Sequence, residues 1–314
     1  MRRFLIKRVA LALVALVLVS MLVFATAEVL PGNVGRTILG RFATSEQVQR
    51  LNEELGVYRP IPVRYGEWVA GFVTGDWGES QLLGRPVREM VLDRLGNSLI
   101  LGAFAILLIV PISIGLGVLA ALHYGKILDR AISVSGLSLI ALPEFVTGVM
   151  LIVLFSVKLG WFPVSSQVPT ANPFDIVRQL LLPSIPLMFV LFGYVARMAR
   201  AGTVEALQSN YTRTAVLKGL PRRTVIWRHV LRNSLLPTIS VVSVQFGYLV
   251  GGLVVVETLF NYPGIGKLVL DAAVGHDLLV LEAAVLVTAI LFMVSNLVAD
   301  LLYGVLNPRV RLAR

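Results

Sequence analysis

Six long apolar stretches recur along the chain, separated by polar segments of unequal length. A membrane-crossing helix needs roughly 20 mostly apolar residues, so this pattern predicts an all-α polytopic membrane protein with six transmembrane helices. The expected spans lie at about Val9–Leu30, Ser98–Leu122, Ala131–Val157, Leu180–Arg200, Leu235–Val256 and Glu282–Leu306.

The composition favours a membrane environment as well. The 314 residues are 56% hydrophobic and 15% charged, with a mean hydropathy of +0.81. That is more apolar surface than one soluble core can bury. The chain has no Cys and only three His. Disulfides and thiolate metal sites are therefore excluded, and we expect no metal site in this chain.

The basic residues are distributed unevenly between alternate segments. With both termini inside, the inner segments hold 17 Lys and Arg against Asp129 and Glu205, whereas the outer segments and adjoining span ends hold 11 Lys and Arg against 14 Asp and Glu. This bias follows the positive-inside rule. It predicts cytoplasmic N- and C-termini in a bacterial-type plasma (inner) membrane. It also explains the formal charge of +10 without nucleic-acid binding.

The first span has a second interpretation. Its basic start, apolar run and Ala25-Thr26-Ala27 also fit a cleaved secretory signal. The apolar run is longer than the roughly 7 to 15 residues of a signal core. We therefore expect residues 1–30 to be retained as a cytoplasmic N-terminus and the first transmembrane helix.

The polar segment 31–97 is too long for a simple connection. We expect a small extracytoplasmic insertion between the first two spans, with a short helix capped by Ser45 and a turn with an interfacial aromatic at Gly75-Asp76-Trp77-Gly78. A surface loop without specific function is the alternative. The rest of the map is a five-helix core over 98–306 and a cytoplasmic tail over 307–314.

The chemistry of nucleotide hydrolysis is missing from the sequence. A phosphate-binding loop reads G-x-x-x-x-G-K-[ST], and in the nearest approach, Gly264-Ile265-Gly266-Lys267, Asn261 replaces the first Gly and Leu268 follows Lys. Neither H-E-x-x-H nor G-x-S-x-G occurs, and the three His fall in separate segments. We expect no catalytic residues in this chain.

The longest inner connection, Arg197 to Ser234, contains helix signals. Ser209 or Asn210 precedes a short helix, Tyr211–Lys218, which Gly219 and Pro221 end. Pro221 then fits the first turn of a second helix. One face of that helix would hold Trp227, Val230, Leu231 and Ser234, and another Arg228, His229 and Arg232. The physics alone leaves two interpretations open: docking into a groove on a partner protein, or lying on anionic lipid.

Here the sequence resembles the coupling loop of ABC importer permeases of the dipeptide, oligopeptide and nickel class. The similarity rests on Asn210-Tyr211-Thr212-Arg213-Thr214-Ala215-Val216-Leu217-Lys218-Gly219-Leu220-Pro221 and on Arg228-His229-Val230-Leu231-Arg232-Asn233-Ser234-Leu235-Leu236-Pro237. Further matching stretches are Leu30-Pro31-Gly32, Leu55-Gly56-Val57-Tyr58-Arg59-Pro60, Gly75-Asp76-Trp77-Gly78, Gly160-Trp161-Phe162-Pro163, Val255-Val256-Glu257-Thr258-Leu259-Phe260, Pro263-Gly264-Ile265-Gly266 and Asn307-Pro308-Arg309.

The resemblance implies a type I ABC importer permease fold and a coupling loop within 197–234. Its site residues would be Tyr211, Arg213, Thr214, Ala215, Lys218, Gly219 and Pro221. It implies a sibling permease, two ATPase subunits that bind the ATP and Mg, and an extracytoplasmic solute-binding protein. The general permease signature begins Glu-Ala-Ala, and Arg213 and Thr214 replace its first two residues, which leaves open which face of the helix meets the ATPase.

Two features inside the spans are candidate pathway and packing sites. Glu144 follows Pro143 in the middle of the third span, where a charge facing lipid costs roughly 2.5 to 3.5 kcal/mol. We expect it on the translocation path beside a Pro-induced break, with a structural hydrogen bond as the alternative. Gly247, Gly251 and Gly252 predict a flat strip on the fifth span for close helix packing, within the chain or with a second subunit.

The expected function is transport of peptides, or of a related solute such as nickel or glutathione. The rivals are a self-powered secondary transporter and a membrane-embedded enzyme. The first is disfavoured because no inverted repeat is visible and only Glu144 and Asp300 are deep ionisable residues. The second lacks a converging set of catalytic residues.

Overall fold

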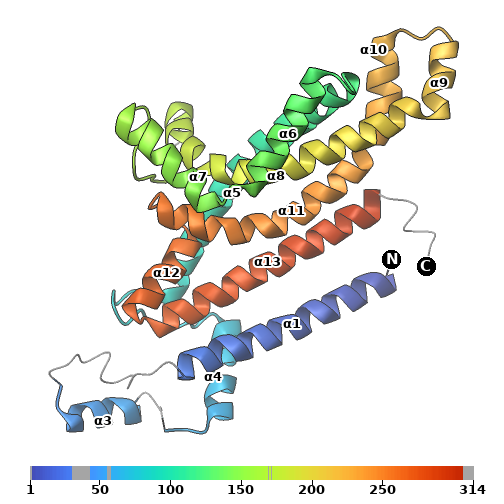
Figure 1. The fold of residues 1–314 in the computed structure, drawn as a ribbon. Helices are drawn as coiled ribbons and strands as arrows, with labels where there is room; N and C mark the ends of the chain where they lie inside the picture. The colour runs from blue at the N-terminus through green and yellow to red at the C-terminus, as the bar shows by residue number, and fades with distance from the viewer. Residues whose placement is uncertain (1, 30–42, 55–57, 169, 171, 307–314) are drawn as a thin grey trace. The chain divides into compact units, whose positions relative to one another are not determined.

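The computed structural model describes residues 2–29, 43–54, 58–168, 170 and 172–306. These residues form helices and no strands (Figure 1). Four helices are long and apolar enough to cross a membrane, and two bent pairs raise the number to six if each pair is one span. The four are α1 (Arg2–Val29), α5 (Val87–Leu122), α8 (Pro173–Gln208) and α13 (Leu278–Leu306). The all-α prediction with six spans is confirmed on this count.

The third span is broken at Pro143, where the sequence analysis expected a proline-induced break. It consists of α6 (Ile127–Ala141), then α7 (Glu144–Leu151) continued by the π-helix η1 (Ile152–Lys158), with a bend of 101° between the two parts. Pro143 causes the break, because its ring disfavours helical backbone at the preceding residue. Leu142 accordingly has extended dihedrals, φ −81° and ψ 122°.

The fifth span lies in α11 (Leu231–Leu259), which is bent by 41° between Gln245 and Gly247. The remaining long helices exceed their expected bounds. α5 begins eleven residues before Ser98, and α8 runs beyond Leu180 and Arg200 at both ends. A hydropathy pattern ends where polar residues begin, whereas backbone hydrogen bonds continue through them.

The chain divides into two compact units. One consists of Leu99–Tyr262 and Phe292–Arg314 with Met1–Phe4, and the other of Leu5–Ser98 and Pro263–Leu291. In the first unit, α8 packs along both α6 and α11 (Figure 1). Its largest fully buried side chains include Tyr262, Phe260, Leu101, Leu180 and Leu182. In the second unit, Val87, Val91 and Val280 are buried together with one face of α12 (Ile265–Gly275), a helix that the sequence analysis did not predict.

Where it is described, the segment 31–97 contains two complete helices, α3 (Ser45–Glu54) and α4 (Ile61–Thr74), and the start of α5. The expected cap at Ser45 is wrong by one residue. Thr44 caps α3 instead: the Gln47 amide donates to Thr44 Oγ1 at 3.3 Å, and the Thr44 amide donates to Gln47 Oε1 at 2.9 Å. Thr44 and Gln47 stand three apart and form the reciprocal capping box, which Ser45 cannot form with Val48.

The expected turn follows α4. Gly75 ends this helix in the left-handed region at φ +88°, and its amide donates to the carbonyls of Gly71 and Phe72. The Trp77 ring stacks on Phe72 with centroids 4.6 Å apart, and its indole N–H donates to the Phe72 carbonyl at 2.9 Å. The aromatic residue thus fixes the turn against the helix that precedes it.

Several sequence predictions lie outside the described residues. These are Leu30 at the end of the first span, the motif Leu30-Pro31-Gly32, the Leu55-Gly56-Val57 part of a second motif, Asn307-Pro308-Arg309, and the tail 307–314. The side chain of Asp300 is also outside the description.

Candidate functional site

The short helix expected in the longest inner connection is present. α9 spans Asn210–Leu217 and follows the end of α8 directly, with Ser209 as the residue between them. Ser209 holds the N-cap position, but its hydroxyl donates to the Ala206 carbonyl at 2.6 Å rather than capping an α9 amide. Thr212 Oγ1 donates to the same carbonyl at 2.7 Å. The two hydroxyls therefore tie α9 to the last turn of α8.

Gly219 ends α9 as the sequence predicted. Its φ is +75°, and a Cβ there would meet no described atom within 4 Å. The Leu220 amide donates to the Ala215 carbonyl and the Gly219 amide to the Val216 carbonyl at 2.9 Å, which is the Schellman arrangement. Because the surrounding space is open, backbone conformation alone selects glycine at this position.

One face of α9 is packed and the other is free. Thr212 and Ala215 are buried, and Ala215 joins Ala206, Val225 and Val230 in a small apolar cluster. At 100° per residue, Arg213, Thr214 and Leu217 lie on the opposite side, and all three are exposed, Leu217 by 79%. Tyr211 and Lys218 are exposed on the flank. Ala215, included among the expected coupling residues, therefore positions the helix and is not open to a partner.

The second expected helix differs in detail. Pro221 is the N-cap of α10 (Arg222–Thr224), not a residue of its first turn, and the π-helix η2 (Val225–Val230) then leads straight into α11. The predicted apolar face is only partly right: Val230 and Ser234 are buried, but Trp227 is 68% exposed. A π turn closes i→i+5 bonds and so rotates less per residue than an α turn, which takes Trp227 off the buried face.

At the break in the third span, Pro143 is the N-cap of α7 and Glu144 is its first residue. The Glu144 carboxylate lies against Gly252 of α11, where a Cβ would stand 2.8 and 2.9 Å from its two oxygens. Within the described ranges no ion pair involves Glu144. The bare backbone of Gly252 thus makes room for a carboxylate next to the break.

The three glycines of α11 do not form the single flat strip that the sequence predicted. Gly247 faces Asn296 and Phe292 of α13, and Gly252 faces Glu144 and Leu187. Gly251 is exposed, with no described atom within 4 Å of a Cβ built there. Consecutive helical positions point about 100° apart, so the Gly251–Gly252 pair serves two different surfaces.

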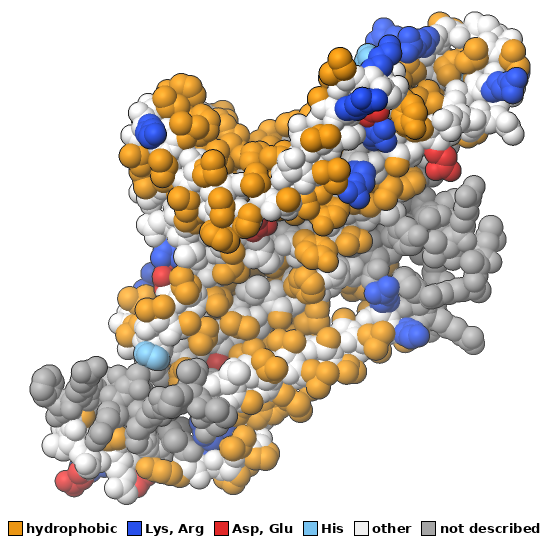
Figure 2. Space-filling model, viewed as in Figure 1, with side chains coloured by type: hydrophobic (Ala, Val, Ile, Leu, Met, Phe, Trp, Pro, Cys, Tyr) orange, Lys and Arg blue, Asp and Glu red, His pale blue; other side chains and the backbone are white. Residues whose placement is uncertain are grey.

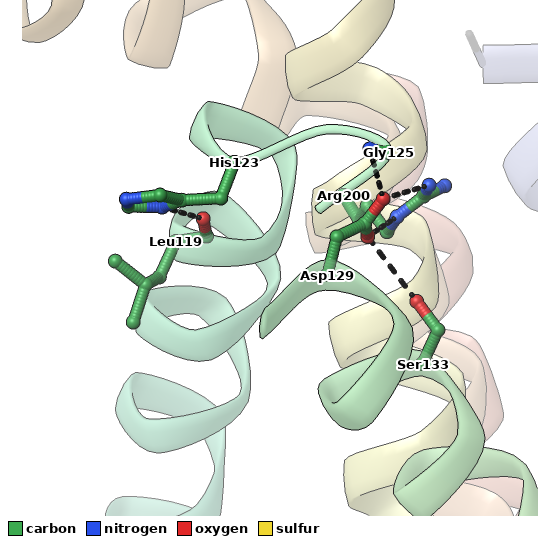
Figure 3. Close-up of polar contacts among 6 residues, drawn as sticks. All are labelled: Leu119, His123, Gly125, Asp129, Ser133 and Arg200. Carbon is green, nitrogen blue, oxygen red and sulfur yellow. Dashed lines mark hydrogen bonds and ion pairs between the residues drawn. The ribbon is translucent and has the colours of Figure 1, made fainter. Parts of the chain in front are cut away.

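A polar cluster that the sequence analysis did not single out joins α6 to α8 (Figure 3). Asp129, which is buried, accepts two hydrogen bonds from the Arg200 guanidinium, one of them 2.8 Å long, and one at 2.9 Å from the Gly125 amide. Arg200 also lies 5.2 Å above the Tyr124 ring. In the sequence, Asp129 is one of only two acidic residues in the basic inner segments. This isolation was the signal from which a pair with a basic residue could have been predicted.

The described part of the chain was expected to lack a metal site. No group of three or more His, Asp or Glu side chains there could hold a metal ion.

Comparison with known proteins agrees with this architecture. Residues 113–312 match the family described as binding-protein-dependent transport system inner membrane component, and residues 1–101 match its N-terminal counterpart. A putative peptide transport system permease protein of Brucella abortus is 35% identical over 312 residues, covering 99% of both chains. The glutathione transport system permease protein GsiC of Escherichia coli K12 is 33% identical over 311 residues, again covering 99% of each. A probable peptide ABC transporter permease protein of Sinorhizobium fredii is 31% identical over 98% of this chain and 99% of its own.

The family match covers more than half of the chain, and the relatives are similar along nearly its full length. The helices of the structure agree with both findings. The chain belongs to the family of binding-protein-dependent transport system inner membrane components and is an ABC importer permease.

Proposed function

We propose that this chain forms part of the translocation pathway for peptides or a related small solute, and that α9 is the element through which separate ATPase subunits drive it. The main support for this proposal is the exposed face of α9. Thr214 and Leu217 are exposed on a short helix whose other face is fixed by the Ala215 cluster and whose end is set by Gly219. An exposed apolar side chain on a rigidly held helix is suited to docking in a groove.

The path from α9 into the membrane is short. α9 is hydrogen-bonded to the last turn of α8, and its buried face contacts η2, which continues as α11. A displacement of α9 would therefore act on two long helices at once. Rigid-body movement of this kind is one of the established routes of alternating access.

The proposed assembly has four kinds of subunit. It combines this chain with a sibling permease, which we propose is a different polypeptide, two ATPase subunits that bind ATP and Mg, and an extracytoplasmic solute-binding protein. The family description as a binding-protein-dependent inner membrane component supports the binding protein and the inner membrane. The exposed backbone at Gly251 is a candidate for close contact with the sibling.

The orientation follows from the charge distribution, with both termini and α9 in the cytoplasm and the segment 31–97 outside. The cargo class is supported by the relatives, which are named for peptide and glutathione transport. Glu144 is proposed to line the path, because its carboxylate sits at the break of a membrane helix and the described residues offer it no cation. Nickel remains an alternative cargo.

Leu217→Asp tests the role of α9. The side chain is exposed, so the change should leave the fold intact while placing a carboxylate in an apolar groove. We expect ATPase subunits to bind the purified permease pair about 10-fold more weakly or worse, since central interface contacts carry most of the binding energy. The matched control is Leu83→Asp, another exposed leucine that lies in the segment 31–97. Equal ATPase binding by Leu217→Asp and wild type would show that α9 is not the docking element.

A further inference from the structure

A cavity of about 250 Å³ lies between the last turn of α5, the middle of α6 and residues 193–200 of α8. Its walls are mostly apolar or glycine, and two arginines close one end. The lining residues are Ala120, Ile132, Ser133, Gly136, Leu137, Gly193, Ala196, Arg197 and Arg200. The volume is slightly below the roughly 300 to 1,000 Å³ typical of small-ligand sites. It therefore suits a charged headgroup with the first part of one chain rather than a whole lipid molecule.

The depth of the cavity comes from the crossing of α6 and α8. The two helices approach so closely that a Cβ on Gly193 would collide with the Gly136 carbonyl and with Ile140. Larger residues would separate the helices and fill the space beside them. The same close approach makes Gly193 unsuitable for a test by substitution.

The two arginines at the mouth differ in their partners. Arg200 is held by Asp129, so that acid is already neutralised (Figure 3). Arg197 is exposed, and no ion pair in the described part of the chain involves it. Lys126 and Arg130, both exposed, belong to the start of α6. Figure 2 shows Lys and Arg side chains gathered over this end of the first unit. The mouth of the cavity thus favours an anion.

The surface around the cavity is apolar beyond the charged mouth. Val134 and Leu137 of α6 are exposed by 61% and 50%. They belong to a helix that is part of a membrane span, where exposed apolar side chains face lipid. An apolar slot that opens among exposed aliphatic side chains, with cations at the cytoplasmic end, matches an acyl chain and its anionic headgroup. Basic pockets between membrane helices on the cytoplasmic side are suited to anionic lipids.

We propose that this cavity binds an anionic phospholipid, with the phosphate at Arg197 and the start of one acyl chain between Ile132, Leu137 and Ala196. The site goes beyond the transport function and needs no contact with the ATPases. Arg200 fixes the position of the mouth through its pair with Asp129. Arg197 supplies the free charge that selects an anionic over a zwitterionic headgroup.

The experiment uses the complete transporter in lipid nanodiscs that contain a photoactivatable phosphatidylglycerol or, in a parallel sample, the matching phosphatidylcholine. Cross-linked peptides are quantified by mass spectrometry. We expect phosphatidylglycerol to label the peptides around residues 132–137 and 193–200 in preference to phosphatidylcholine. A cation near an anionic headgroup contributes enough that Arg197→Gln should lower this labelling about five-fold. Arg197→Lys should retain most of it.

Two further variants control for the fold. Arg178→Gln makes the same change on α8 far along the helix, at an exposed position, and should leave the labelling unchanged. Leu137→Trp fills the apolar part of the cavity without removing charge and should lower labelling by both lipids. Equal labelling by the two lipids, or labelling that survives Arg197→Gln, would refute the proposal. So would efficient cross-linking of Leu137→Cys to the sibling permease, because the cavity would then be a subunit interface.

Discussion

Arg200 on α8 donates two hydrogen bonds to Asp129 in the first turn of α6, and this ion pair joins the two helices near the end of α8 that leads to α9. The Asp129 side chain is almost fully buried, and the Arg200 side chain is 27% exposed. Gly125 and Ser133 also hydrogen-bond the carboxylate. A pair with these additional partners is well placed to keep α6 and α8 moving as one body.

Breaking this pair should destabilise the protein. Removing one partner of a buried pair costs on the order of 3 kcal/mol, because the other charge is left without compensation, and the partial exposure of Arg200 reduces that figure. We therefore expect Asp129→Asn to lower the melting temperature of the purified permease pair by several degrees. The corresponding change Glu46→Gln removes one partner of an exposed pair with Arg50 in α3. It should have no measurable effect on the melting temperature. Identical melting of all three proteins would mean that the Asp129 pair is not structural.

The membrane orientation can be tested with single cysteines, because the natural chain has none. Ser45 and Ser165 are exposed in segments proposed to lie outside, and Asn210 is exposed in the segment proposed to lie inside. A membrane-impermeant maleimide applied to whole cells should label cysteines at the first two positions and spare the third. Ser166 is unsuitable, because it is only 1% exposed and would be unlabelled on either side. Labelling of Asn210→Cys alone would reverse the proposed topology.

Glu144 gives a test of the pathway. Glu144→Gln keeps the shape and one hydrogen-bonding oxygen, so assembly and basal ATP hydrolysis should be retained while uptake falls. Glu144→Leu removes all polarity, and we expect uptake to fall about 10-fold or more, since hydrogen bonds to charged groups contribute roughly 1.5 to 3 kcal/mol. Uptake in reconstituted vesicles is measured beside ATP hydrolysis. Transport at the wild-type rate in both variants would make Glu144 a structural residue.

Gly252 allows a second test of whether the position of the Glu144 carboxylate matters for transport. Its missing side chain leaves the space that the Glu144 carboxylate occupies, with Leu187 on the same side. Gly252→Ala should displace the carboxylate and reproduce part of the Glu144→Gln defect. Gly115→Ala in α5 is the matched control, because a Cβ there also meets no described atom within 4 Å.

Much of the candidate site could be predicted from the sequence, because local chemistry decides it. Gly219 followed by Pro221 requires the end of a helix whatever the tertiary context, and the structure has that end with Gly219 at φ +75°. Pro143 predicts a break for the same reason. Its angle of 101° could not be predicted, because packing against other helices sets it.

The sequence predictions failed where a shift of one residue, or a change in helical rotation, alters which side chain occupies a position. Thr44 replaces Ser45 as the cap because only Thr44 stands three residues before Gln47. Trp227 leaves the buried face because a π turn interrupts the helical phase. The Asp129–Arg200 pair joins residues 71 positions apart, and nothing local in the sequence connects them.

The last prediction concerns Gly219, whose left-handed backbone costs a residue with a side chain about 1 to 2 kcal/mol. Gly219→Val should relieve this strain by unwinding the end of α9, since a β-branched residue is strongly disfavoured there. The spans and the sibling contact should survive, while ATPase docking or substrate-stimulated hydrolysis is lost. Gly219→Asn should be tolerated, because Asn enters this region more readily. Gly84 has φ +58° and equally open surroundings, so Gly84→Val imposes the same strain in the segment 31–97. If Gly219→Val and Gly84→Val hydrolyse ATP and transport alike at wild-type rates, α9 does not couple hydrolysis to transport.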